Sequence, residues 1–306
     1  MTEHVSPSAP VRQLPSSEWV HYQLYCRVRE AVASLPIYFR TETHISGIMA
    51  TDLHTLNTVL GATIEDQVVR TLNLLRHTWD PDDRYPLYSF TRQAQTFPDV
   101  LLRKTSSGEI LMGIELKGWY LLAKESEPSL RFQATLAACA FQDLVVVVPW
   151  VLGNVISGSP ILFEPFIESA RYAAEYRNFH WRYIRESKTE KGIIIPEGIE
   201  PYPSKSDHIL DRSLSDGGGN FGRLARAGMM DVYSHKLEDV HLCGIKTVYW
   251  RQFLKAFQES TTDAQAQTAL KRLKHRIQQS SDTPSSRAQS ALVIVAELER
   301  LLELPE

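Results

Sequence analysis

Two short apolar segments separated by a tight turn constrain the fold of this chain more than any other feature. Residues 100–103 and 110–116 are rich in aliphatic side chains, and Ser107 and Gly108 stand between them. Short apolar runs joined by turn-forming residues are typical of a β-hairpin. The sequence therefore predicts two antiparallel strands over these residues.

Charged residues are placed at the open end of this predicted hairpin. Asp99 comes directly before the first strand, and Glu115 and Lys117 lie near the end of the second. Side chains two positions apart on a strand share a face, so Glu115 and Lys117 are expected to point the same way. The start of one hairpin strand lies beside the end of the other, which is expected to bring Asp99 close to Glu115.

Two carboxylates and an ammonium group at one place have a definite chemical use. Paired carboxylates can hold a hard divalent cation such as Mg²⁺ through oxygen ligands. That cation can polarise a phosphodiester and acidify a bound water molecule. A lysine on the same face can position the water or the developing negative charge. The hairpin is therefore a candidate for metal-assisted phosphodiester hydrolysis, and its alternative interpretation is a plain hairpin with a surface salt bridge.

The Pro-Asp pair before the first strand and the Glu-Leu-Lys run in the second resemble the PD-(D/E)xK nuclease superfamily, and within it the type II restriction endonucleases. The resemblance covers about residues 60–150. It implies that Asp99, Glu115 and the backbone carbonyl of Leu116 bind Mg²⁺. It also implies that Lys117 serves the attacking water.

The same resemblance implies an activity and partners. The expected reaction is site-specific hydrolysis of double-stranded DNA that leaves 5′-phosphate and 3′-hydroxyl ends. Cutting both strands of a palindrome with one site per chain requires two chains, so a two-fold homodimer is expected. A separate protective DNA methyltransferase is expected as well, because this chain carries no methyltransferase motif.

The elements predicted around the hairpin follow the order of the superfamily core. Apolar residues at helical spacing predict a helix over 52–77, and a strand is expected over 87–96. A helix over 129–141 and a strand over 144–148, buried on both faces, follow the hairpin. The expected fold is α/β (α+β), a restriction-endonuclease-like core with a central mixed sheet flanked by helices and with helical N- and C-terminal additions. The superfamily often places a glutamate on the helix before the hairpin, and Glu65 is the candidate here, although a solvated helix acid is an equal alternative.

Three regions are expected along the chain. Residues 1–15 are rich in Ser and Pro and are expected to be disordered. Residues 16–200 are expected to form the nuclease core with its N-terminal helices. Residues 201–306 are expected to be mainly helical and to serve DNA recognition or dimerisation. Further predicted elements are helices over 16–34, 165–186, 248–257, 263–279 and 288–302 and a short strand over 193–195.

Candidates for DNA contact lie in the C-terminal region. The glycine-rich stretch 213–228 matches G-x-G-x-x-G, but the polar segment before it is no buried strand, so a dinucleotide site is rejected. Arg223 and Arg226 are three apart, as near neighbours on a helix are, and arginine binds phosphate or guanine. A basic cluster in the predicted helix 263–279 can neutralise phosphates, and solvated surfaces are the alternative for both. The candidates are Asn220, Arg223, Arg226, Lys271 and Lys274.

Charge, cysteine content and hydropathy limit the class of protein and the cellular location that can be expected. The 306 residues carry a formal net charge of −3, which a DNA enzyme tolerates if its basic residues gather in one cleft. The three cysteines are widely spaced and odd in number, which argues against a disulfide framework and favours a reducing cytoplasm. No apolar run reaches the roughly 18 residues of a membrane span, and the polar start resembles no signal peptide. A cytoplasmic protein without a membrane partner is expected.

Two alternative functions remain open from the sequence. The first is another task within the same superfamily, such as DNA repair, phage processing or RNA cleavage. Exonucleases of the superfamily usually carry Gln-x-x-x-Tyr after the hairpin, whereas Gln133 is followed at that spacing by Ala137. The second alternative is a non-catalytic nucleic-acid-binding protein.

Overall fold

The computed structural model describes residues 7–47, 56–93, 96–123, 127–255 and 262–279. Its α-helices are α1 (Tyr22–Ala33), α2 (Leu35–Tyr38), α3 (Leu56–Leu74), α4 (Arg76–Trp79), α5 (Ala170–Phe179), α6 (Asp231–Glu238), α7 (Thr247–Leu254) and α8 (Asp263–Gln279). Two shorter helical turns are the 3₁₀ turn η2 (Leu136–Ala138) and the π turn η3 (His180–Ile184). The main strands are β1 (Tyr88–Arg92), β2 (Val100–Lys104), β3 (Ile110–Tyr120), β4 (Leu144–Leu152), β5 (Pro160–Leu162) and β6 (Phe166–Ser169). Two small ribbons are formed by β7 (Ile193–Ile194) with β8 (Arg212–Ser213) and by β9 (His241–Leu242) with β10 (Ile245–Lys246).

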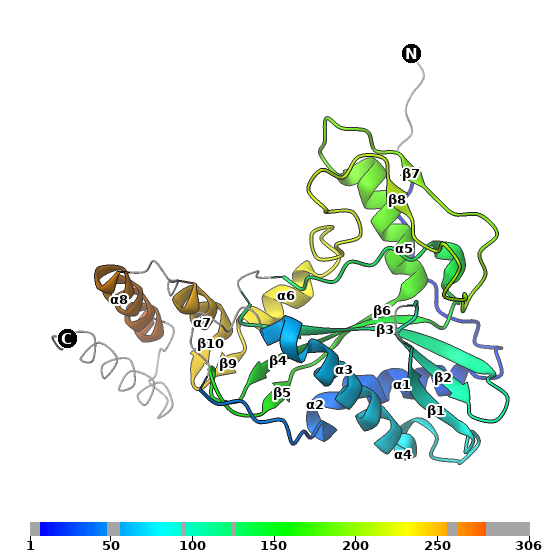
Figure 1. The fold of residues 1–306 in the computed structure, drawn as a ribbon, viewed down its shortest axis with the longest axis horizontal. Helices are drawn as coiled ribbons and strands as arrows, with labels where there is room; N and C mark the ends of the chain where they lie inside the picture. The colour runs from blue at the N-terminus through cyan, green and yellow to red at the C-terminus, as the bar shows by residue number, and fades with distance from the viewer. Residues whose placement is uncertain (1–6, 48–55, 94–95, 124–126, 256–261, 280–306) are drawn as a thin grey trace.

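One six-stranded mixed sheet organises the molecule (Figure 1). Strands β1, β2 and β3 form an antiparallel meander, and β4 then pairs with β3 in parallel. Both β5 and β6 pair antiparallel with β4, β5 near its end and β6 near its start. The expected mixed sheet flanked by helices is thus present.

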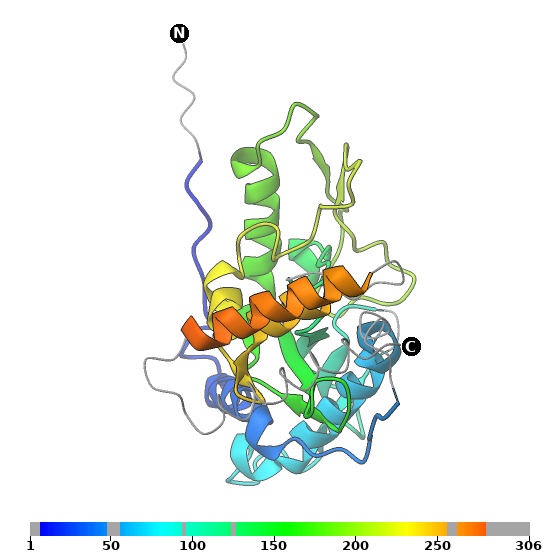
Figure 2. The same cartoon turned by 90° about the vertical axis from the view of Figure 1, so that its left-hand side faces the viewer.

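Helices cover the sheet from the two sides. Helix α3 packs on β1 and β3, and α1 and α2 complete this layer together with α4. Helix α5 packs on β4, β6 and η2 instead, and Figure 2 shows it rising out of the sheet layer with the β7–β8 ribbon beside it. The β2–β3 hairpin, inside the sheet, therefore lies between the α3 layer and the β7–β8 ribbon.

The predicted hairpin is confirmed. Strands β2 and β3 pair with Val100 opposite Ile114. The second strand is longer than expected and continues to Tyr120, because β4 pairs with it through that residue. The predicted strand over 144–148 is also confirmed, and all nine residues of β4 are buried. Helix α3 confirms the predicted helix within the described residues, and β1 lies inside the predicted strand over 87–96.

The helix expected over 129–141 is absent, which removes one of the two supports for the family resemblance. Within that range only the three residues of η2 are helical. The segment instead bonds to distant chain: Phe132 N–H donates to the Gly222 carbonyl at 2.8 Å, and Thr135 N–H donates to the Ile209 carbonyl at 2.7 Å. These long-range backbone bonds satisfy groups that a helix would have paired locally, and tertiary context overrides helix propensity.

Two further expectations are corrected. The aromatic helix expected over 165–186 begins at Ala170, because residues 166–169 form β6 against β4. The disorder expected for residues 1–15 does not hold for the described part, residues 7–15. There the Arg12 guanidinium donates to Glu168 at 2.8 Å and lies over the Tyr172 ring at 4.4 Å.

The C-terminal region differs from the expected helical one in its first part. Residues 214–230 form turns, and helices appear only from α6 onward. Helices α7 and α8 match the helices expected over 248–257 and 263–279, and the helix expected over 288–302 lies outside the described residues. No helix in the described ranges is both long enough and apolar enough to span a membrane.

Candidate active site

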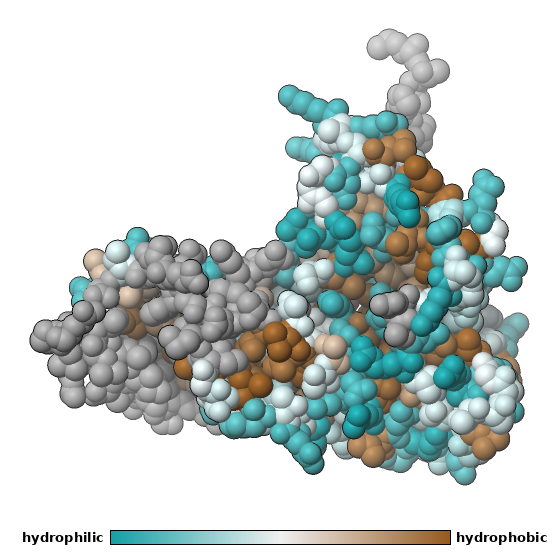
Figure 3. All heavy atoms as spheres, viewed as in Figure 1, coloured by the Kyte–Doolittle hydropathy of each residue, from teal (hydrophilic) through white to brown (hydrophobic). Residues whose placement is uncertain are grey.

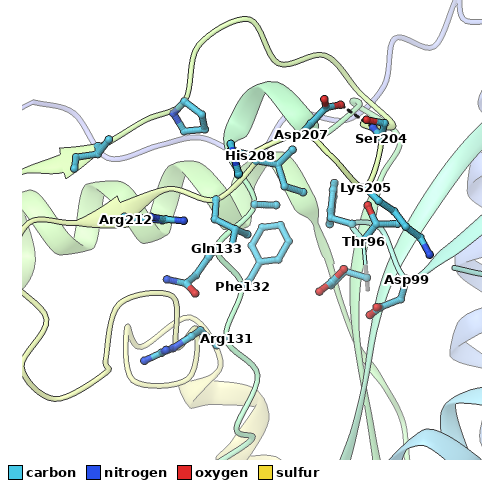
Figure 4. Close-up of a pocket in the computed structure, with 17 residues that line it drawn as sticks. Thr96, Asp99, Arg131, Phe132, Gln133, Ser204, Lys205, Asp207, His208 and Arg212 are labelled. Carbon is cyan, nitrogen blue, oxygen red and sulfur yellow. Dashed lines mark hydrogen bonds between the residues drawn. The ribbon is translucent and has the colours of Figure 1, made fainter. Parts of the chain in front are cut away.

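A cleft of about 740 Å³ opens where the hairpin faces the β7–β8 ribbon (Figure 4). Asp99 and Glu115 line it from the hairpin. Phe132 and Arg131 line it from the segment that leads to β4, and Lys205 belongs to the stretch before β8. The two acids predicted from the sequence thus share one opening in the surface.

The position of Asp99 is fixed by backbone contacts. The Leu116 N–H donates to Asp99 Oδ2 at 3.1 Å, which connects the start of β2 to β3. On the other side, the Gln93 side-chain amide donates to the Pro98 carbonyl at 2.9 Å. Gly113 leaves room for the Pro98 ring, because a Cβ built on Gly113 would lie 2.2 Å from Pro98 Cγ. Asp99 is therefore held against β3, as the hairpin geometry predicted.

The surroundings of Asp99 favour its protonated form. Burial is the largest cause, and with the negative charge of Glu65 it raises the pKa of Asp99 to about 6. The Leu116 hydrogen bond and the positive charges of Lys117 and Arg92 act in the opposite direction.

Glu115 is in a still less favourable position for a carboxylate. Burial and then the charge of Asp99 raise the pKa of Glu115 well above its ordinary value. Its Oε2 atom is buried and has no hydrogen-bond partner among the described residues. A buried acid oxygen without a partner, next to a second acid, would be stabilised by a proton or by a cation.

Lys117 lies on the Glu115 side of β3. The strand alternates as expected, with Ile114 and Leu116 buried while Glu115 and Lys117 are partly exposed. The positive charge of Lys117 acts on both acids and opposes the rise in their pKa values. Lys117 therefore lies near the acid pair, although it does not line the cleft.

Glu65 reaches the same strand from α3. Its Oε1 accepts a hydrogen bond from the Gly118 N–H at 3.2 Å, and its Oε2 lies 3.3 Å from the Arg92 guanidinium. Its charge contributes to the raised pKa values of Asp99 and Glu115. Glu65 is thus neither a solvated helix acid nor part of the cleft lining. It is bonded to β3 beside the acid pair.

The oxygen donors fit a hard divalent cation in their chemistry. Asp99, Glu115 and the Leu116 carbonyl would be the ligands, and water would complete the shell of Mg²⁺. The buried, unpartnered Glu115 Oε2 is the observation that favours such a charge. A set of three or more His, Cys, Asp or Glu side chains arranged to hold a metal is not found in the described part of the chain. The two carboxylates and the carbonyl would therefore have to suffice.

The residues predicted to contact DNA do not line this cleft. Arg226 donates to Glu127 at 2.7 Å and also bonds the Asn220 side chain. Arg223 donates to the Gly219 carbonyl at 3.0 Å, within turns rather than on the expected helix. Both arginines stabilise the glycine-rich loop. Lys271 and Lys274 lie on α8, at the opposite end of the molecule from β7 and β8 (Figure 1).

The sequence did not point to the basic side of the cleft. Four residues with basic side chains line it, and all are exposed: Arg131, Lys205, His208 and Arg212. They are scattered over some 80 positions and form no run or motif, so only the folded chain brings them together. Figure 4 shows Arg131 and Arg212 across the cleft from Asp99.

A buried acid fastens this side of the cleft to the sheet. Asp143 accepts hydrogen bonds from the Gly113 N–H at 2.7 Å and the Ala140 N–H at 2.8 Å, and Tyr202 donates its hydroxyl at 3.0 Å. Burial is the main reason that the pKa of Asp143 is raised to about 6. Its place directly before the valine run was the available signal, since a carboxylate that enters a buried strand needs partners.

A buried ion pair provides the second attachment. Arg177 of α5 bonds Asp211 and also donates to the Phe132 and Ala134 carbonyls, each at 3.0 Å. Both charged side chains are almost fully buried, at 2% and 0% exposure. Burial lowers the pKa of Arg177 to about 10. This pair connects α5, the segment 129–141 between β3 and β4 (the crossover segment) and the stretch before β8.

Comparison with models of known protein families, with curated protein sequences and with solved structures gave no match. The chemistry of the site itself is therefore the basis for its function.

Proposed function

We propose that this protein is a Mg²⁺-dependent endonuclease that hydrolyses double-stranded DNA at specific sites. One observation carries the proposal: Asp99 and Glu115 open into one cleft, and the buried Glu115 Oε2 lacks a partner among the described residues. Burial is the main reason that the pKa values of both acids are raised, and the charge of Asp99 adds to the rise for Glu115. A bound cation would favour the ionised form of both acids.

The chain supplies three things to this reaction. Asp99, Glu115 and the Leu116 carbonyl would hold the ion. A bound Mg²⁺ would polarise the scissile phosphodiester and lower the pKa of a water molecule. Lys117, on the same face, orients that water or stabilises charge on the phosphate oxygens. Products with 5′-phosphate and 3′-hydroxyl ends are expected.

Glu65 has a supporting role in this proposal. It is bonded to the Gly118 amide and to Arg92, so it fixes β3 behind the acid pair and keeps negative charge near it. We propose it as a positioning residue of the site. A two-fold homodimer and a separate methyltransferase belong to the same proposal, because a palindrome is cut on both strands and the host DNA needs protection.

The test is cleavage of plasmid and phage DNA with Mg²⁺ and with EDTA. Wild-type protein is expected to give discrete bands only with Mg²⁺. Asp99→Asn, Glu115→Gln and Lys117→Ala are each expected to slow cleavage by on the order of 10²-fold or more. Glu109→Gln is the matched control, because Glu109 is an exposed acid at the closed end of the same hairpin.

The alternatives give different results in the same assay. Cleavage only of RNA, of damaged duplexes or from free ends would indicate another nuclease task. DNA that is bound and never cut, with Mg²⁺ or Mn²⁺, would show that the protein is a binding protein and would refute the enzyme proposal.

A further inference from the structure

The cleft is lined by acids of the hairpin and by basic side chains of a second segment. Asp99 and Glu115 belong to the hairpin, whereas Lys205, His208 and Arg212 project from the segment 204–212, which also contributes Asp207. In Figure 4, Arg212 lies across the cleft from Asp99, and Lys205 lies on the same side as Asp99. We call this segment the basic wall. Figure 3 shows the surrounding face as largely hydrophilic, with hydrophobic residues gathered near β7 and β8, where Ile194 is exposed.

The basic side chains of the wall are available to a ligand. No ion pair of Lys205, His208 or Arg212 occurs within the residues that the structure describes, and all three side chains are exposed. Arg131 differs, because its guanidinium bonds the Gly219 carbonyl and lies 3.8 Å from Asp216. The other DNA candidates, Arg223 and Arg226, already bond protein groups.

The backbone of the basic wall is fixed relative to the acids. Tyr202 bonds Asp143, which in turn holds β3 through the Gly113 amide. At the other end, Asp211 N–H donates to the Gln133 carbonyl at 2.9 Å, and the Asp211 carboxylate pairs with Arg177. Basic side chains on a fixed backbone, in the same cleft as a pair of acids, are placed to hold an anion that the acids alone would repel.

We infer that the basic wall is the substrate-binding surface of the cleft and that Lys205 and Arg212 contact backbone phosphates of duplex DNA beside the scissile one. His208 lies between them in sequence and adds a third donor. Arginine and lysine both bind phosphate oxygens, arginine in a bidentate manner. The inference rests on the proposed function. It makes Lys205 and Arg212 the main phosphate contacts, in place of the residues predicted from the sequence: Arg223, Arg226, Lys271 and Lys274.

The test measures DNA binding separately from cleavage. Duplex DNA is titrated with the Asp99→Asn protein in EDTA at several salt concentrations, so that cutting does not interfere. Lys205→Ala and Arg212→Ala, added to this background, are each expected to weaken binding several-fold. Each is also expected to reduce the slope of log K against log salt concentration by about 1, because one phosphate contact is lost.

The matched control comes from the same chain. Lys188→Ala removes an exposed lysine from the neighbouring loop outside the cleft. It is expected to leave the affinity and the salt slope unchanged. Thermal unfolding of each variant checks that the fold is intact.

The outcomes separate the two proposals. If the wild type cleaves DNA while Lys205→Ala and Arg212→Ala keep the same DNA affinity and salt slope, the proposed role of the basic wall is refuted. The nuclease proposal is then unaffected. Loss of affinity in the wall variants without any wild-type cleavage would support the wall as a DNA-binding surface and contradict the enzyme. In the cleaving protein, the wall variants are expected to raise KM more than they lower kcat, since these residues do not touch the reacting atoms.

Discussion

The two sides of the cleft are built in opposite ways. The acidic side consists of one hairpin, in which Asp99 and Glu115 are 16 positions apart and are brought together by regular strand pairing. The basic wall has almost no regular structure apart from β8, and its basic side chains come from residues 205–212. The hairpin is held by a backbone ladder, whereas the wall is held by a few buried side chains.

This difference shows which kind of site a sequence makes visible. Strand periodicity and a turn are local patterns, so the order of residues alone places Glu115 and Lys117 on one face. Side-chain attachments between distant segments have no local signature. The contrast also predicts that the wall is sensitive to single polar substitutions and the hairpin to steric ones.

The largest effect is expected from the Arg177–Asp211 pair. Arg177→Met leaves the Asp211 charge buried without its main partner and is expected to lower the free energy of unfolding by about 3–5 kcal/mol. Urea denaturation measures this loss. The double variant Arg177→Met with Asp211→Leu is the control and is expected to regain much of it, because no lone charge remains. A loss below about 1 kcal/mol in the single variant would show that the wall does not depend on this pair.

A smaller effect is expected from a methyl group on the hairpin side. Gly113→Ala places a Cβ against the Pro98 ring and is expected to cost about 1–3 kcal/mol of stability and to slow cleavage, because Asp99 follows Pro98. Gly61→Ala is the matched control, since its Cβ meets nothing within 4 Å inside α3. That change is expected to stabilise the protein by roughly 0.5–1 kcal/mol. Equal effects of both substitutions would contradict the close packing of Pro98.

The smallest effect concerns pH and belongs to the acidic side alone. The pKa of Asp99 is about 6 in the folded protein, above its ordinary value of 3.8. The folded state therefore keeps a proton that the unfolded chain loses, and the resulting penalty grows as pH rises from about 4 to about 6. The measurement is the free energy of unfolding in EDTA as a function of pH. Between pH 4 and pH 7, the free energy of unfolding of Asp99→Asn is expected to rise by about 1–2 kcal/mol relative to that of the wild type, a value reduced for partial solvent exposure.

Adding Mg²⁺ sharpens this experiment. The ion is expected to stabilise the wild type at pH 7 more than at pH 5, and to stabilise Asp99→Asn less at either pH, because binding competes with protons. Lys205→Ala is the control from the basic wall, and its free energy of unfolding is expected to depend on pH and Mg²⁺ as that of the wild type does. Parallel plots of the free energy of unfolding against pH for wild type and Asp99→Asn in EDTA would show that the pKa of Asp99 is not raised.

The sequence by itself determined the sheet centre and the acidic side of the site. The turn at Ser107 and Gly108, the alternation around Glu115 and the valine run of β4 are signals that strand geometry and burial impose directly. They were enough to predict that Asp99 and Glu115 lie close together, and both line one cleft. The positive charge of Lys117 acts on both acids, but Lys117 does not line the cleft.

Only the tertiary structure decided the crossover and the basic wall. The sequence predicts a helix over residues 129–141, yet their backbone bonds the Ile209 and Gly222 segments, so long-range pairing replaces the helix. The same pairing places Arg131 and Arg212 in the cleft that the acids also line. It leaves Arg223 bonded to Gly219 and Arg226 bonded to Glu127, where both stabilise the glycine-rich loop. The physical reason is that strand and turn preferences act within a few residues, whereas the cleft depends on which distant backbone and charged groups find each other once the core is closed.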